Sequence, residues 1–206
     1  MDERQLEQRE SAAQTHFPLP AIVQLHTRHF GVTQAEAGVF AESAGVCFAR
    51  HHVCPTIVSL LDTPTTYLVS WPLPDDRTLA AYANVDDATR DGAYGVSLAV
   101  VEHRLELVAL ARAETRTGAD FYVGPSGMAL VDLEDVARLE VSGTDHGDEA
   151  EVRRRLKKKV DQVGASGVNG PALACVVGFK AAAVAVQQLL WIQRASNAKP
   201  PAQSVG

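Results

Sequence analysis

Two carboxylates in this sequence have the spacing of a metal site. Asp120 stands at the start of a short β-rich segment, residues 121–123. Glu140 lies inside the next such segment, residues 136–141. Mg²⁺ prefers hard oxygen ligands and is usually held by one or two carboxylates together with substrate phosphate oxygens. Carboxylates on adjacent strands meet that need, and the metal would activate a water for attack on a phosphodiester. Asp120 and Glu140 are therefore candidate metal ligands and catalytic residues.

Both carboxylates also have a purely structural explanation. Asp120 follows a Gly-Ala pair, and an Asp in such a turn can hydrogen-bond its own backbone. Glu140 lies between two apolar residues, where burial is costly unless the carboxylate meets a metal, a cation or hydrogen-bond donors. A solvated position at a sheet edge, or an ion pair with Arg138 or Arg112, would satisfy Glu140 as well. Both explanations remain open from the sequence.

The first half of the chain is predicted to form an N-terminal layer over residues 16–84, preceded by a flexible arm over residues 1–15. Apolar residues recur at three- and four-residue spacing from 33 to 51, which predicts an amphipathic helix. Residues 56–61 and 66–71 are rich in β-branched and aromatic residues around a turn, which predicts a hairpin.

The second half is predicted to form a core over residues 85–194, followed by a disordered tail over residues 195–206. Its predicted elements are a helix over 86–103, strands over 105–113, 121–123 and 136–141, a helix over 148–164 and a buried strand over 172–179. An Ala-rich run over 181–194 is predicted to add a C-terminal helix. The order is α-β-β-β-α-β, which indicates an α/β protein.

This order, with Asp120 at the second strand and Glu140 on the third, resembles the restriction-endonuclease-like superfamily, known by its PD-(D/E)XK motif. The resemblance covers residues 85–180 and is carried by Gly-Ala-Asp-Phe at 118–121 and Leu-Glu-Val-Ser at 139–142. It implies a restriction-endonuclease-like core, a mixed sheet flanked by helices in which the Asp and the Glu converge at a fork to bind Mg²⁺. Residues 87–93 and 138–143 are also similar to a group of uncharacterised bacterial proteins with a variant Glu-Val-Ser motif.

The sequence departs from the superfamily pattern at two positions. Ser142 occupies the place of the usual lysine, which orients the nucleophile and neutralises charge on the phosphate. A serine can donate a hydrogen bond to the attacking water but brings no positive charge. Arg90 lies where nucleases of this class often place a further Glu. Lys157, Lys158 or Lys180 could supply the missing charge from another element, and Ser142 stays a candidate catalytic residue.

The resemblance leads to two functional hypotheses. The first is a Mg²⁺-dependent nuclease with a degenerate active site that hydrolyses phosphodiester bonds of DNA. The second is a catalytically inactive nuclease-like protein, retained as a binding or scaffolding subunit of a larger bacterial complex. Because a fold does not determine function, the missing lysine gives weight to the second hypothesis.

A basic segment over residues 153–159 holds six cationic side chains. Acidic residues precede it, which suits a solvated helix whose charges follow the helix dipole. It could instead lie along a phosphate backbone, each contact adding salt-dependent affinity. The candidate nucleic-acid-binding residues are then Arg154, Lys157, Lys158 and Gln162.

The Ala-rich run over 181–194 is apolar around much of the predicted helix, which is typical of a helix buried in its domain or against another chain. We expect it to support a homodimer or a hetero-complex, with Trp191 and Ile192 as interface anchors. A core helix that covers the N-terminal layer is the alternative.

The composition limits the partners and the compartment. A net charge of −6 over 206 residues argues against indiscriminate binding of polyanions. The three cysteines have neither metal-ligand spacing nor an even number, so free thiols are expected. A charged N-terminus and the lack of an apolar run of about 18 residues predict a cytoplasmic protein without a membrane partner.

Overall fold

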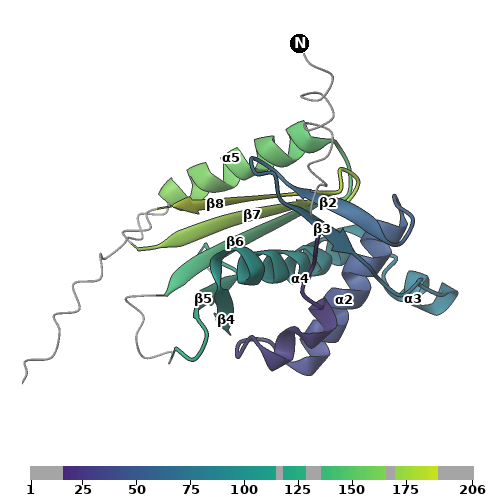
Figure 1. Cartoon of the computed structure of the whole chain (residues 1–206), viewed down its shortest axis with the longest axis horizontal. Helices are drawn as coiled ribbons and strands as arrows, with labels where there is room; N and C mark the ends of the chain where they lie inside the picture. The colour runs from purple at the N-terminus through teal and green to yellow at the C-terminus, as the bar shows by residue number, and fades with distance from the viewer. Residues whose placement is uncertain (1–15, 115–117, 129–135, 166–169, 190–206) are drawn as a thin grey trace, which may run out of the picture.

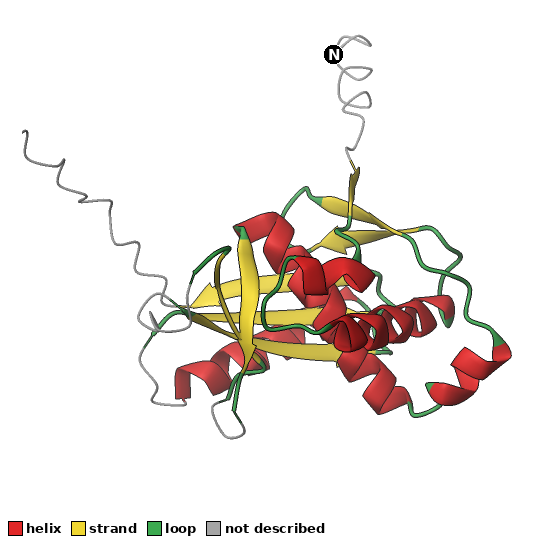
Figure 2. Ribbon diagram, turned by 90° about the horizontal axis from the view of Figure 1, so that it is seen from below, coloured by secondary structure: helices red, strands yellow, loops and turns green. Residues whose placement is uncertain are grey.

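One mixed sheet of eight strands runs through the part of the chain that the computed structural model describes, residues 16–114, 118–128, 136–165 and 170–189. The strand order is β1-β3-β2-β8-β7-β6-β5-β4. Figure 1 shows α5 on one face of the sheet and α2 and α4 on the other, and Figure 2 shows the same layers from below. The protein is therefore an α/β protein, as predicted.

The strands are β1 (His16–Pro18), β2 (Thr56–Leu60), β3 (Thr66–Val69), β4 (Leu107–Arg112), β5 (Phe121–Pro125), β6 (Ala137–Thr144), β7 (Ala172–Gly178) and β8 (Ala183–Leu189). The helices of the described residues are η1 (Ile22–Thr27), a 3₁₀ helix, and the α-helices α2 (Gln34–Ala49), α3 (Asp76–Ala81), α4 (Val85–Leu105) and α5 (Glu149–Ala165). None of these helices is long and apolar enough to cross a membrane.

The two long helices on one face begin at well-formed caps. Thr33 and Glu36 form a capping box at the start of α2, which satisfies two backbone N–H groups that lack helical partners. The Asn84 side chain accepts from the first backbone N–H groups of α4. The helices approach closely at Gly92, where a Cβ would lie 2.9 Å from the Ala44 nitrogen. This close contact explains a glycine within a helix, where its intrinsic propensity is poor.

The elements from α4 to β7 follow the predicted order α-β-β-β-α-β. Strands β4, β5 and β6 form an antiparallel meander, and β7 pairs with β6 in parallel after the crossover through α5. The predicted N-terminal helix and hairpin are also present, as α2 and the antiparallel pair β2 and β3. The helix α3 was not predicted.

The predicted C-terminal helix is wrong over residues 183–189, which form strand β8. Its alternate side chains enter two different cores: Val184 packs on the α2 and α4 side, whereas Ala183 and Ala185 pack on the α5 side. Pairing with β7 and with β2 supplies backbone hydrogen bonds on both edges of β8, which overrides the helix propensity of its alanines. Strand β8 thus joins the N-terminal hairpin to the core in one sheet. Trp191 and Ile192 lie outside the described residues.

A fully buried histidine ties β4 to α4. The Nδ1 of His29 accepts from the Ala109 backbone N–H at 2.8 Å, and its Nε2–H donates to Glu102 at 3.0 Å. Burial lowers the pKa of His29, although the Glu102 carboxylate acts in the opposite direction. Burial by itself would raise the pKa of Glu102, but hydrogen bonds from Arg28 and His29 outweigh it and lower that pKa. His29 is therefore neutral in the folded protein at neutral pH.

Folding stability is expected to fall as the pH drops below about 6.5, the ordinary pKa of histidine. In that range the unfolded chain binds a proton at His29 that the folded chain resists, because His29 has a lowered pKa in the folded state. The loss from this group is at most about 1.4 kcal/mol per pH unit. Urea unfolding at a series of pH values measures it. The same acid slope in a His29→Gln variant would contradict this assignment.

Candidate functional site

Asp120 joins α4 to β6 at the start of β5. Its Oδ1 accepts from the Tyr94 hydroxyl of α4 at 2.7 Å, and its Oδ2 accepts from the Val141 backbone N–H at 2.8 Å. Its own backbone N–H donates to the Leu139 carbonyl of β6 at 2.8 Å. The side chain therefore satisfies donors from two other elements, which differs from the turn residue considered from the sequence.

Aromatic packing fixes the Tyr94 hydroxyl in place. The Tyr94 ring packs edge-to-face on Phe121, with ring centroids 5.4 Å apart, and the Arg112 guanidinium lies 4.5 Å from the Tyr94 centroid. Burial raises the pKa of Tyr94 to about 12, and the hydrogen bond to Asp120 acts in the same direction. The phenol is consequently protonated at neutral pH and donates a hydrogen bond to Asp120.

Glu140 points toward the other helix layer. Its neighbours Leu139 and Val141 both belong to the core cluster that contains α2 and α4. Because side chains alternate along a strand, Glu140 faces α5. Its Oε1 accepts from the Lys159 ammonium of α5 at 2.5 Å. The two side chains are 16% and 25% exposed, so the pair is largely shielded from solvent.

The sequence analysis counted Lys159 in the basic segment but proposed Arg138 or Arg112, and not Lys159, as an ion-pair partner for Glu140. The signal for it was present: Lys159 follows the buried Leu156 by three residues on a helix, which places both on the sheet-facing side. The structure thus brings Asp120 together with Tyr94, and Glu140 together with Lys159.

Ser142 and Arg90 meet at a small polar pocket of about 220 Å³ between α4 and β6. Its lining residues are Asp86, Thr89, Arg90, Tyr94, Val141, Ser142 and Gly143. The Arg90 guanidinium donates to Asp87 and Asp91 at 2.9 Å each, so acids of its own helix balance its charge. Glu140 does not line this pocket. Across the described residues, no group of three or more His, Cys, Asp or Glu side chains could hold a metal ion.

The helix α4 packs directly on the backbone of β6 beside this pocket. A Cβ at Gly143 would lie 2.6 Å from the Thr89 carbonyl oxygen and 3.0 Å from the Ala93 Cβ. Position 143 therefore has no room for a side chain while α4 keeps its place.

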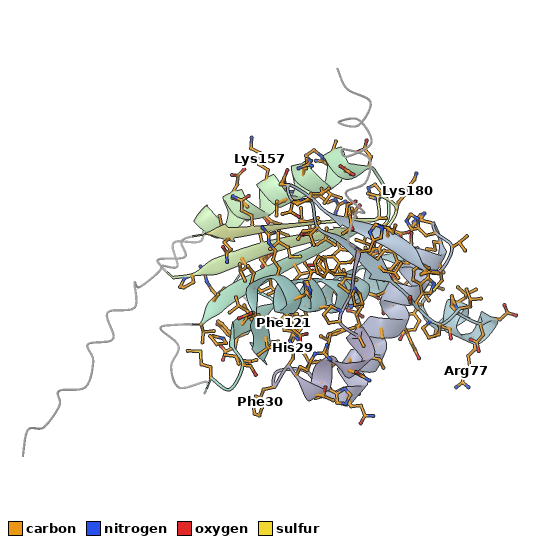
Figure 3. The ribbon with its side chains drawn as sticks, in the orientation of Figure 1. His29, Phe30, Arg77, Phe121, Lys157 and Lys180 are labelled. Carbon is orange, nitrogen blue, oxygen red and sulfur yellow. The ribbon has the colours of Figure 1, made fainter. Side chains whose placement is uncertain are left out.

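Most cations of α5 have carboxylate partners. Arg153 contacts Asp62, and both Arg154 and Arg155 lie 2.7 Å from Glu151. Three of the four candidate nucleic-acid-binding residues are exposed: Lys157, Lys158 and the neutral Gln162. The two lysines make no ion pair with the described residues. Figure 3 shows Lys157 projecting away from the sheet. The fourth, Arg154, is 71% exposed but is bound to Glu151.

Two of the three cysteine thiols are unsuited to nucleophilic chemistry. Burial raises the pKa of Cys47 and that of Cys175 to about 12, so both stay protonated at neutral pH. The two histidines that precede the third cysteine, Cys54, also have structural partners. His51 lies 3.2 Å from Asp145, and the His52 Nε2–H donates to the Phe179 carbonyl at 2.8 Å.

Comparisons of the chain with protein-family models, with curated proteins and with solved structures found no match. The geometry of the described residues therefore carries the functional argument.

Proposed function

We propose that this protein has a nuclease-like core that does not hydrolyse phosphodiesters and serves as a binding or scaffolding subunit. The observation that carries the proposal is that the two carboxylates have different partners on different helices. Asp120 is bonded to Tyr94 of α4, whereas Glu140 faces α5 and pairs with Lys159. A single Mg²⁺ needs its protein oxygens to converge on one point, together with oxygens of the phosphate. The donor set does not fit such an ion.

The positions of β6 that face α4 support the same proposal. These positions carry Val141 and Gly143, which provide neither a carboxylate for a metal nor an amine for a phosphate. At Gly143 the Thr89 carbonyl fills the space that a side chain would need. The usual lysine position of the superfamily pattern carries Ser142, which also provides no amine.

The charge distribution favours a protein over DNA as the partner. Phosphate contacts need free cations, and ion pairs hold four of the six cations over residues 153–159, which leaves Lys157 and Lys158. Apolar side chains are available instead on β2 and β3. Ile57 and Leu68 are paired across these strands and are 44% and 41% exposed. Paired apolar residues of this kind can contribute to a protein interface.

Nuclease assays test the proposal. Purified protein is incubated with supercoiled plasmid and with single-stranded DNA in Mg²⁺ or Mn²⁺, beside Asp120→Ala and Glu140→Ala. We expect no metal-dependent cleavage product that is lost in Asp120→Ala or in Glu140→Ala. The exposed acid Asp161 of α5 gives a matched control, Asp161→Ala, which separates the site from a contaminating nuclease. Cleavage that requires the metal, survives Asp161→Ala and disappears in both site variants would overturn the proposal.

A further inference from the structure

Strand β4 is the last strand of the sheet, so one of its edges has no strand partner among the described residues. The segment that follows η1 covers this edge. The Gly31 N–H donates to the Ala109 carbonyl at 2.9 Å, and the Ala109 N–H donates to the Nδ1 of His29 at 2.8 Å. Both backbone groups of Ala109 are therefore satisfied by this segment, residues 28–31, which we call the latch.

The latch lies directly on the backbone of β4. A Cβ at Gly31 would lie 2.5 Å from the Ala111 nitrogen and 2.7 Å from the Ala111 Cα, so a side chain at position 31 would push the latch away. Phe30 is 84% exposed, and Figure 3 shows it projecting away from the protein beside His29. The contact with β4 thus depends on His29 and Gly31.

The latch is anchored on both sides. Leu25 of η1 and Val32, which follows the latch, are both buried in the main core. These anchors limit an opening of the latch to the few residues between them. Opening can therefore be a local event that leaves η1 and α2 in place.

The contact with β4 requires a neutral imidazole at His29. A carboxylate only accepts hydrogen bonds, so the Nε2 that lies 3.0 Å from Glu102 carries a proton. A backbone N–H only donates, so the Nδ1 that faces Ala109 carries none. A second proton on the ring could enter only at Nδ1, where two N–H groups would then face each other. Protonation of His29 is consequently incompatible with the closed latch.

The charged groups that act on His29 come from α4 and from the latch itself. Burial has the largest effect on the pKa of His29 and lowers it, the Glu102 carboxylate raises it, and the Arg28 guanidinium lowers it. The net effect is a lowered pKa, and neither α2 nor β4 adds a charge to this set among the described residues.

The sign of the pH dependence follows from the environment of His29. When the latch leaves β4, water reaches the imidazole, and its pKa returns toward the ordinary value of about 6.5. The closed latch is therefore fully stable above about pH 6.5, and protons favour the open latch below that pH.

We infer that residues 28–31 form an acid-sensitive latch, which covers the edge of β4 at neutral pH and releases it in mild acid when His29 takes up a proton. Release exposes the N–H and the carbonyl of Ala109. An uncovered strand edge is a template for pairing with a further strand. The latch therefore makes access to this edge of the sheet dependent on pH.

Native-state hydrogen exchange of the Ala109 and Gly31 amides, followed by NMR on the full chain, tests the latch. Protection factors are compared between about pH 7 and pH 5, a range in which Glu102 keeps its charge because its pKa is lowered. We expect both protection factors to fall by up to about tenfold per pH unit below about pH 6.5, since opening takes up one proton. Low concentrations of urea should not accelerate this local exchange, whereas the buried amides of β7 should respond steeply.

Two histidine variants make the result specific to the latch. His29→Asn places an amide oxygen near the position of Nδ1 but cannot titrate, so the protection of Ala109 should not change with pH. His26→Asn is the matched control, because the Nδ1–H of His26 donates only within η1, to the Val23 carbonyl at 3.1 Å. This variant should keep the full acid response.

The ¹⁵N shifts of the His29 ring in the original protein give a readout that does not require either variant to fold. They should show a neutral ring with its proton on Nε2 at neutral pH. A proton on Nδ1, Ala109 protection that is independent of pH, or exchange that follows urea as steeply as that of β7 would each overturn the inference. An acid response that persists in His29→Asn, or that disappears in His26→Asn, would do the same.

Discussion

Gly143→Val is expected to destabilise the folded protein by about 3 kcal/mol. The new side chain would start 2.6 Å from the Thr89 carbonyl oxygen, so either α4 or β6 must move. Both elements belong to the main core, and overpacked cores force backbone shifts and strained rotamers. Urea denaturation at neutral pH measures the loss.

Gly38→Ala is the matched control for Gly143→Val. Gly38 lies inside α2, and a Cβ there would meet nothing within 4 Å. Alanine at this position should therefore raise stability by about 1 kcal/mol through helix propensity. If Gly143→Val were as stable as the original protein, α4 could move away from β6. Position 143 could then take a side chain, which would contradict the close packing of α4 on β6.

Asp120→Ala is expected to lower the free energy of unfolding by about 3 kcal/mol. The substitution leaves two donors without acceptors, the Tyr94 hydroxyl and the Val141 backbone N–H. Each buried unsatisfied donor costs about 1 to 3 kcal/mol. Asp120→Asn retains one carbonyl oxygen and should lose less.

A double-mutant cycle between Asp120→Ala and Tyr94→Phe isolates this interaction. Thermal or urea unfolding of the four proteins should give a coupling energy of about 1 kcal/mol or more. A catalytic carboxylate is often kept at a cost to stability, so its removal tends to be neutral or stabilising. A stable Asp120→Ala protein would therefore contradict the structural role and favour a catalytic one.

Periodicity in the sequence was sufficient for most elements. The three- and four-residue apolar spacing over 33–51 and the β-branched runs over 56–61 and 66–71 predicted α2, β2 and β3, which the structure contains. The strand β8 was mispredicted because Ala and Val occur in both helices and strands. Only its two pairing partners, β7 and β2, decide between these structures.

The candidate site was harder to predict because it depends on the face of the sheet to which each side chain points. The number of residues between two side chains does not determine that face. The twenty-residue offset between Asp120 and Glu140 fits adjacent strands, and the register confirms that β5 and β6 are neighbours. The direction of the Glu140 side chain depends on which residues of β6 enter the larger core. Leu139 and Val141 enter it, which sends Glu140 to α5. Tyr94 was absent from the prediction since nothing local marks its hydroxyl as a partner of Asp120.

Binding of Mn²⁺ measured by isothermal titration calorimetry tests the central claim, that Asp120 and Glu140 do not share a metal ion. The titration compares the original protein with Asp120→Asn and Glu140→Gln, which remove one charge each with little change of shape. We expect no Mn²⁺ binding that both substitutions abolish. One Mn²⁺ bound per chain, with its heat lost in each of the two variants, would contradict it.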